Sequence, residues 1–153
     1  IDEFNENNVQ VRFIGSRKGL PEIVQQKMDH AVEATKNNTG IILNLAINYG
    51  GQAEILHAVR TIAAEAANGT LAGDDIDNNV IENHLYTKGL PAPDLLIRPG
   101  GDLRISNFLL WQIAYAEIWT TKVFWPEFTP DHLVEAILAY QGRERRFGGL
   151  VSQ

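Results

Sequence analysis

Two hydrophobic periodicities divide this chain into segments. Apolar residues either alternate with polar ones or form short aliphatic runs, which predicts strands, or they recur at helical spacing, which predicts helices. The predicted strands cover residues 9–14, 41–47 and 94–98. The predicted helices cover residues 21–36, 52–68 and 78–86, a stretch from Ser106 or Asn107 through Ala114, and residues 130–141 after a start at Thr129.

The order of these segments indicates the fold class. Strands that alternate with helices form βα units, in which consecutive strands lie parallel. We therefore expect one α/β domain over residues 1–153, a parallel twisted sheet flanked by helices. Asp77 is placed to cap the helix that follows it, and Gly69 stands where a helix commonly ends in a left-handed residue.

Composition narrows the class of protein. Of 153 residues, 44% are hydrophobic and 21% are charged, as in ordinary globular proteins. Lys and Arg number 13 against 19 Asp and Glu, so the net charge is −6 and a nucleic acid is not an expected partner. The sequence has no cysteine, which excludes disulfides and thiolate metal sites. No apolar run reaches the ~18 residues that span a bilayer, and we expect a cytoplasmic protein.

Two of the predicted strands end in Gly-Gly loops, at residues 48–51 (NYGG) and 98–101 (RPGG). Ligands of open α/β sheets bind beyond the carboxyl ends of the strands, and glycine lets the backbone approach a ligand closely. The simpler interpretation is that both pairs only form tight turns, because glycine is the default turn residue.

The loop at residues 98–101 is accompanied by more side chains that can bind an anion. Arg98 closes its strand, and Arg104 and Ser106 follow within eight residues. Guanidinium groups bind phosphate oxygens in pairs, and a serine hydroxyl with the free amides of a following helix can donate further hydrogen bonds. These residues could form a diphosphate site, or the arginines could pair with Asp94 and Asp102 at the surface.

Glu117 is the other unusual residue, because it lies in an otherwise apolar stretch. A carboxylate there must be paired, neutral or bound to a metal such as Mg²⁺. From its spacing alone, a structural ion pair is the favoured interpretation. If a short helix and a returning strand follow Ser106, Glu117 would come back towards the candidate site.

Several segments of the chain form distinctive motifs. They are residues 48–55 (NYGGQAEI), 97–117 (IRPGGDLRISNFLLWQIAYAE), 125–128 (WPEF) and 143–149 (RERRFGG), with a strand at 11–15 (VRFIG). These segments resemble signatures of the cis-prenyltransferase family. The resemblance runs in order over nearly the whole chain. It is closest to bacterial members that make the lipid carrier precursor for cell-wall synthesis.

The resemblance implies both an activity and an assembly. These enzymes are homodimers that extend an allylic diphosphate, usually farnesyl diphosphate, by cis condensation with isopentenyl diphosphate. Mg²⁺ assists, diphosphate leaves, and the long-chain product implies a peripheral contact with the inner face of the membrane. Their fold is a parallel sheet flanked by helices, as the periodicity of this chain also predicts.

The resemblance also implies roles for individual residues. Arg98, Arg104 and Ser106 would bind isopentenyl diphosphate, and Glu117 would help to place Mg²⁺. Asn48 would lie near the reacting centre. Arg146 and Gly148 form the terminal Arg-x-Gly, which would reach the diphosphate site of the partner subunit.

Three positions of the longest signature depart from the family pattern. Pro99 stands where a threonine is usual, and proline removes any backbone N–H contact. Asp102 and Leu103 replace the usual glutamate and a polar residue. The shorter carboxylate can keep its function, whereas Leu103 cannot donate a hydrogen bond.

The family's Asp-Gly-Asn-Gly-Arg-Trp loop, which binds the allylic diphosphate, has no counterpart in this sequence, and neither do the helices of the product tunnel. We therefore expect residues 1–153 to be the C-terminal portion of a single cis-prenyltransferase domain that is inactive alone. The alternative is a non-catalytic subunit of a cis-prenyltransferase complex. The presence of all four diphosphate and metal residues favours a catalytic origin.

Overall fold

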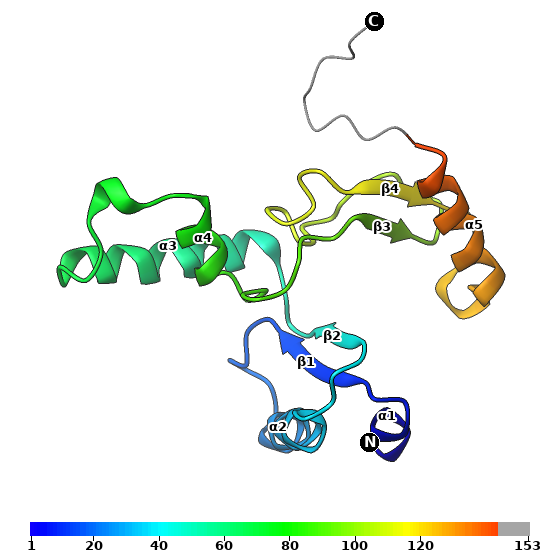
Figure 1. Ribbon diagram of the computed structural model, residues 1–153, viewed down its shortest axis with the longest axis horizontal. Coiled ribbons are helices and arrows are strands. Elements are labelled where there is room, and N and C mark those ends of the chain that lie inside the picture. Colours follow the sequence, from blue (N-terminus) through cyan, green and yellow to red (C-terminus); the bar gives the residue numbers. More distant parts are fainter. Residues whose placement is uncertain (144–153) are drawn as a thin grey trace, which may run out of the picture. The chain divides into compact units, whose positions relative to one another are not determined.

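The computed structural model describes residues 1–143 (Figure 1). The chain divides into two compact units, Ile1–Gly89 and Leu90–Gln153. Each unit contains one pair of parallel strands with helices beside it, so the predicted α/β class with parallel strands is confirmed. No helix among the described residues is long and apolar enough to cross a membrane.

The first unit contains two strands and most of the helices. Its strands and helices match the sequence prediction, except that α1 and the short 3₁₀ turn η1 were not predicted. The elements are α1 (Asp2–Glu6), β1 (Gln10–Ile14), α2 (Glu22–Thr35), β2 (Ile42–Ala46), α3 (Gly51–Ala67), η1 (Gly73–Asp75) and α4 (Asn78–His84).

Strands β1 and β2 pair in parallel, with register from Gln10 opposite Ile42 to Ile14 opposite Ala46. Helix α2 packs on β1, where Val11 and Ile14 are buried. The side chain of Thr35, at the end of α2, is fully buried in the same region. Its Oγ1 accepts a hydrogen bond from the Val11 amide at 3.0 Å and donates to the carbonyl of Ala31 at 2.8 Å.

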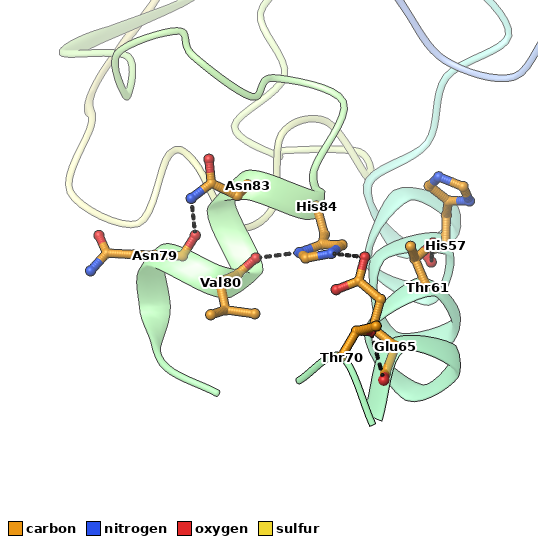
Figure 2. Close-up of polar contacts among 8 residues, drawn as sticks. All are labelled: His57, Thr61, Glu65, Thr70, Asn79, Val80, Asn83 and His84. Carbon is orange, nitrogen blue, oxygen red and sulfur yellow. Dashed lines mark hydrogen bonds and ion pairs between the residues drawn. The ribbon is translucent and has the colours of Figure 1, made fainter. Parts of the chain in front are cut away.

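Helices α3 and α4 pack against each other through a polar contact (Figure 2). The ring of His84 on α4 lies between the Val80 carbonyl, 2.6 Å from Nδ1, and the Glu65 carboxylate on α3, 3.1 Å from Nε2. Hydrogen bonding to the Val80 carbonyl first, and to Glu65 second, raises the pKa of His84 above its ordinary value. The predicted cap is also confirmed, since Asp77 accepts from the amide of Val80 at 2.9 Å.

The second unit is built around β3 and β4 (Figure 1). They pair in parallel, Leu95 opposite Glu117 and Arg98 opposite Thr120, and α5 packs next to β4. The predicted last helix is confirmed, with Thr129 and His132 forming a capping box at its start. The elements are β3 (Leu95–Arg98), β4 (Glu117–Thr120), the 3₁₀ turn η2 (Trp125–Glu127) and α5 (Pro130–Gln141).

The helix predicted from Ser106 or Asn107 is wrong. Residues 106–116 form successive turns with isolated hydrogen bonds such as the one from the Ile113 amide to the Leu109 carbonyl. Ser106, Asn107 and Leu109 have φ angles of 52°, 63° and 47°. A right-handed helix cannot pass through left-handed residues, so the helical spacing of apolar residues in this stretch does not produce a helix.

Candidate functional site

A hollow of about 300 Å³ opens where β3 ends in the second unit. Two arginines and a serine supply its polar wall, and aliphatic and aromatic side chains supply the rest. The lining residues are Leu96, Ile97, Arg98, Pro99, Arg104, Ile105, Ser106 and Phe108. The structure therefore brings together Arg98, Arg104 and Ser106, which the resemblance assigns to isopentenyl diphosphate.

Arg98 is the best-fixed member of this polar wall. Its Nη1 donates to the backbone carbonyl of Arg104 at 2.5 Å and to Ser106 Oγ at 3.1 Å. Its side chain is only 25% exposed, whereas that of Arg104 is 67% exposed. The loop thus holds the Arg98 guanidinium in place through Nη1, and Nη2 takes no part in these two hydrogen bonds.

Asp102 accepts from both arginines. Its Oδ2 lies 2.6 Å from Nη2 of Arg104 and 3.5 Å from Nη2 of Arg98. Both interpretations of the sequence therefore describe part of the structure, because the arginines line a common hollow and also pair with a nearby carboxylate. Asp102 is one of the two partners that the sequence suggested, and both arginines form ion pairs with it.

The backbone of this loop is held in an uncommon conformation. Gly100 and Gly101 have φ angles of 92° and 80°, and the three left-handed residues that follow at 106, 107 and 109 are not glycine. The amides of both glycines donate across to the strand region after β4, to the carbonyls of Val123 and Thr121 at 2.8 Å. Left-handed non-glycine residues cost free energy and are frequent at binding sites, where the surrounding structure maintains them.

Glu117 is not part of the hollow. It begins β4 opposite Leu95, so it lies about 10 Å along the strand pair from Arg98 and on the opposite face. Strand β4 runs back towards the hollow, with Thr120 opposite Arg98, but Glu117 is the residue at its far end. Glu117 Oε2 instead accepts from Nη1 of Arg143 at 2.6 Å, which is the structural ion pair that its spacing favoured.

Glu117 fits Mg²⁺ only as one member of a larger ligand set. Among residues 1–143, no three or more His, Cys, Asp or Glu side chains gather where they could bind a metal. Mg²⁺ is commonly held by one or two carboxylates together with phosphate oxygens and water. A metal at Glu117 would therefore need most of its ligands from a bound diphosphate and solvent, and Arg143 would have to release the carboxylate.

Asn48 lies in the first unit and has a visible structural function. It lies two residues after the end of β2, and its φ of 49° is in the left-handed region. Its side-chain amide donates to the carbonyls of Ser16 at 2.9 Å and Lys18 at 3.2 Å. Asn48 thereby joins the loops that follow β1 and β2, and a role near the reacting centre stays a prediction.

The sequence did not single out Glu54, the most deeply buried charged side chain among the described residues. It lies in the first turn of α3 and is 1% exposed. Its carboxylate accepts from Tyr49 Oη at 2.5 Å and from the Tyr86 amide at 2.8 Å. Glu54 thus connects the 48–51 loop to the segment after α4. Its position three residues beyond a Gly-Gly loop was the one available signal.

Pro99 and Leu103, two of the departures from the family pattern in this loop, lie differently relative to the hollow. Pro99 lines the hollow, so its missing N–H removes one donor that the wall could otherwise offer. Leu103 is 82% exposed and is not among the lining residues. Arg146 and Gly148 lie outside the described residues.

The family model described as "Putative undecaprenyl diphosphate synthase" matches residues 1–148. The chain belongs to this family. Isoprenyl transferases of Geobacillus kaustophilus and Halalkalibacterium halodurans are 49% identical to it over 150 residues and 52% identical over 145 residues. The alignments cover 98% and 95% of this chain but 58% and 57% of the relatives. The chain thus spans less than three fifths of the length of these relatives.

Solved structures of prenyl diphosphate synthases have the same fold as this member of the family. Lavandulyl diphosphate synthase from Lavandula x intermedia, in complex with dimethylallyl diphosphate, has a TM-score of 0.89 and 40% identity. A probable undecaprenyl diphosphate synthase from Campylobacter jejuni has a TM-score of 0.80 and 34% identity. The matches cover 92% and 96% of this chain, and 60% and 66% of those chains. They confirm the predicted fold and family.

Proposed function

We propose that this chain provides the isopentenyl diphosphate half-site of a cis-prenyltransferase. The whole enzyme would condense isopentenyl diphosphate onto an allylic diphosphate, with farnesyl diphosphate as the expected starter, and make a long-chain polyprenyl diphosphate. The observation that carries this proposal is the hollow at the end of β3, where Arg98, Arg104 and Ser106 meet. The names of the relatives, which are isoprenyl transferases and prenyl diphosphate synthases, support it.

The lining of the hollow suits a ligand with an anionic head and a short apolar tail. Guanidinium groups bind phosphate oxygens through charge-assisted hydrogen bonds, and the Ser106 hydroxyl can add one more. The apolar side chains of Leu96, Ile105 and Phe108 offer the surface against which a five-carbon isopentenyl group would lie. Its volume of about 300 Å³ is at the small end of ligand sites, as a substrate of this size requires.

Each group of this chain would have a binding or orienting function. Arg98 and Arg104 would neutralise the isopentenyl diphosphate and hold its head, so that the isopentenyl double bond is presented to the allylic partner. Glu117 offers one carboxylate to Mg²⁺, which would supply charge neutralisation for the leaving diphosphate. Asn48 would fix the loop after β2 at the edge of the reacting region.

The proposal includes the assembly that the family resemblance implies. Arg146 and Gly148 would reach the diphosphate site of a second copy in a homodimer. The long-chain product would bring the enzyme to the inner face of the membrane. Because the chain spans less than three fifths of its relatives, we expect no prenyl transfer from this polypeptide alone.

Isothermal titration of the chain with isopentenyl diphosphate and Mg²⁺ tests the half-site. We expect measurable binding, and R98A should weaken it at least about tenfold, because one charge-assisted contact contributes about 1.5–3 kcal/mol. R98K keeps the charge but not the paired geometry and should fall between R98A and the unchanged chain. R60A, which removes an exposed arginine of α3, is the matched control.

Two results would count against the proposal. Absence of binding would favour the alternative, a non-catalytic subunit of a cis-prenyltransferase complex that lacks a working diphosphate site. Binding that R60A weakens as much as R98A would mean a general charge effect rather than a site at the end of β3.

A further inference from the structure

The two arginines of the hollow already share an anionic ligand from their own loop. Asp102 Oδ2 lies within 3.5 Å of Nη2 of Arg98 and 2.6 Å of Nη2 of Arg104. A single oxygen that contacts two guanidinium groups is the arrangement that a phosphate oxygen would make in the same place. One carboxylate therefore satisfies donors that the proposed substrate needs.

The contacts of Arg98 show which part of this arrangement can exchange. Nη1 of Arg98 bonds to the Arg104 carbonyl and to Ser106 Oγ, so the loop itself maintains the position of the guanidinium. Among the described residues, Nη2 of Arg98 forms a hydrogen bond only with Asp102. Removing the carboxylate would thus leave Arg98 anchored and free one donor.

Asp102 is also accessible enough to leave. Its side chain is 47% exposed, and in the described part of the chain only the two arginines form hydrogen bonds with its carboxylate. Exposed ion pairs of this kind are weak, because water solvates both partners once they separate. A diphosphate, with more negative charge and more oxygens than one carboxylate, can replace it at both arginines.

We propose that Asp102 is an exchangeable internal ligand of the diphosphate site, which occupies the two arginines in the free protein and is displaced by the incoming anion. This inference rests on the proposed function for the identity of the substrate, but it concerns any diphosphate that enters the hollow. Asp102 neutralises two neighbouring cations when no ligand is bound. It lowers the affinity for diphosphate by competing with it.

The proposal predicts effects of opposite sign on stability and on binding. In D102N the arginines lose their internal anion, so the folded chain should be less stable because two cations lie together without a counter-charge. The same change removes the competitor, so diphosphate should bind more tightly. A residue that merely positioned the arginines would lower both stability and affinity when it was changed.

The test is isothermal titration of the chain with inorganic pyrophosphate and, separately, with isopentenyl diphosphate, together with thermal denaturation. D102N should bind pyrophosphate about threefold more tightly, the size expected for loss of an exposed ion pair, and should melt at a lower temperature. D102E, which keeps the carboxylate, should bind like the unchanged chain. D131N makes the same charge change in the first turn of α5 and should alter neither binding nor melting much.

The other possible results would overturn the exchange proposal, the proposed function or both. Equal or weaker binding of pyrophosphate by D102N overturns the exchange proposal, whatever happens to stability, and D102S repeats the comparison if D102N folds poorly. Binding of pyrophosphate without isopentenyl diphosphate would remove the proposed function and keep the exchange. Binding of neither ligand by the unchanged chain or by D102N would overturn both.

Discussion

The two units of this chain differ in how regular their backbone is and in the polar groups that they expose. In Ile1–Gly89 the helices are regular, most of the buried apolar residues lie there, and the buried Thr35 and Glu54 have hydrogen-bond partners. In the described part of the second unit, buried apolar residues are few, and an irregular loop contains five left-handed residues between positions 100 and 109. The proposed anion site is in this second, less regular unit.

This difference suggests that, as is common in α/β proteins, one part of the molecule maintains the structure and another part binds the ligand. In the first unit, the buried side chains of Thr35 and Glu54 accept from backbone amides of the same unit, those of Val11 and Tyr86. In the second unit, the arginines are satisfied by an accessible carboxylate that a ligand can replace. Binding requires donors that are available, so some local stability is given up where the ligand enters.

Glycine substitutions should give the largest difference between the units in loss of unfolding free energy. Gly15 and Gly101 both have positive φ, 114° and 80°, but an alanine Cβ at Gly15 would lie 2.1 Å from the Ile47 carbonyl oxygen. At Gly101 the nearest atoms, those of Lys122, are 3.8 Å away. We expect G15A to cost at least about 3 kcal/mol of unfolding free energy and G101A only about 1–2 kcal/mol, since it meets only the left-handed penalty. Urea denaturation followed by circular dichroism measures both, and equal losses would contradict the contrast.

The buried hydroxyl of the first unit should give the next largest effect. T35V keeps the size of the side chain but removes the acceptor of the Val11 amide, which then lies buried without a partner. We expect a loss of about 2 kcal/mol in urea denaturation. T35S retains the hydroxyl and should lose clearly less. If T35S proves as unstable as T35V, packing of the methyl group rather than the hydrogen bond is responsible.

The smallest expected effect concerns the polar contact between α3 and α4. The pKa of folded His84 is raised above 6.5, chiefly by the Val80 carbonyl and then by Glu65, while Lys88 opposes the shift. The protonated ring therefore stabilises the fold fully below pH 6.5, and this contribution is lost as pH rises through the raised pKa. The melting temperature of the unchanged chain should fall more between pH ~6 and ~8 than that of H84Q.

H30Q is the matched control for this pH dependence. His30 is an exposed residue of α2, so its removal should leave the pH profile of the melting temperature unchanged. A profile for H84Q that is parallel to that of the unchanged chain would show that the contact in Figure 2 does not couple to protonation.

The sequence allowed most elements to be predicted because their signals are local. Alternation over residues 9–14 and helical spacing over residues 52–68 depend only on neighbours along the chain, and β1 and α3 formed there. The same reasoning failed between Ser106 and Ala114, where apolar spacing is helical but three left-handed residues prevent a helix. Strand β4 was missed because Glu117 and Thr120 flank only two apolar residues, too few for a clear period.

By itself, the sequence determined the α/β class, the parallel strands, the family and the presence of Arg98, Arg104 and Ser106 on one loop. Only the tertiary structure decided how these groups are used. The parallel register of β3 and β4 puts Glu117 at the opposite end and face from Arg98, and the turns after Gly101 bring Asp102 against both arginines. Residue types and spacing fix which charges are available, whereas strand register and backbone torsions fix which of them meet.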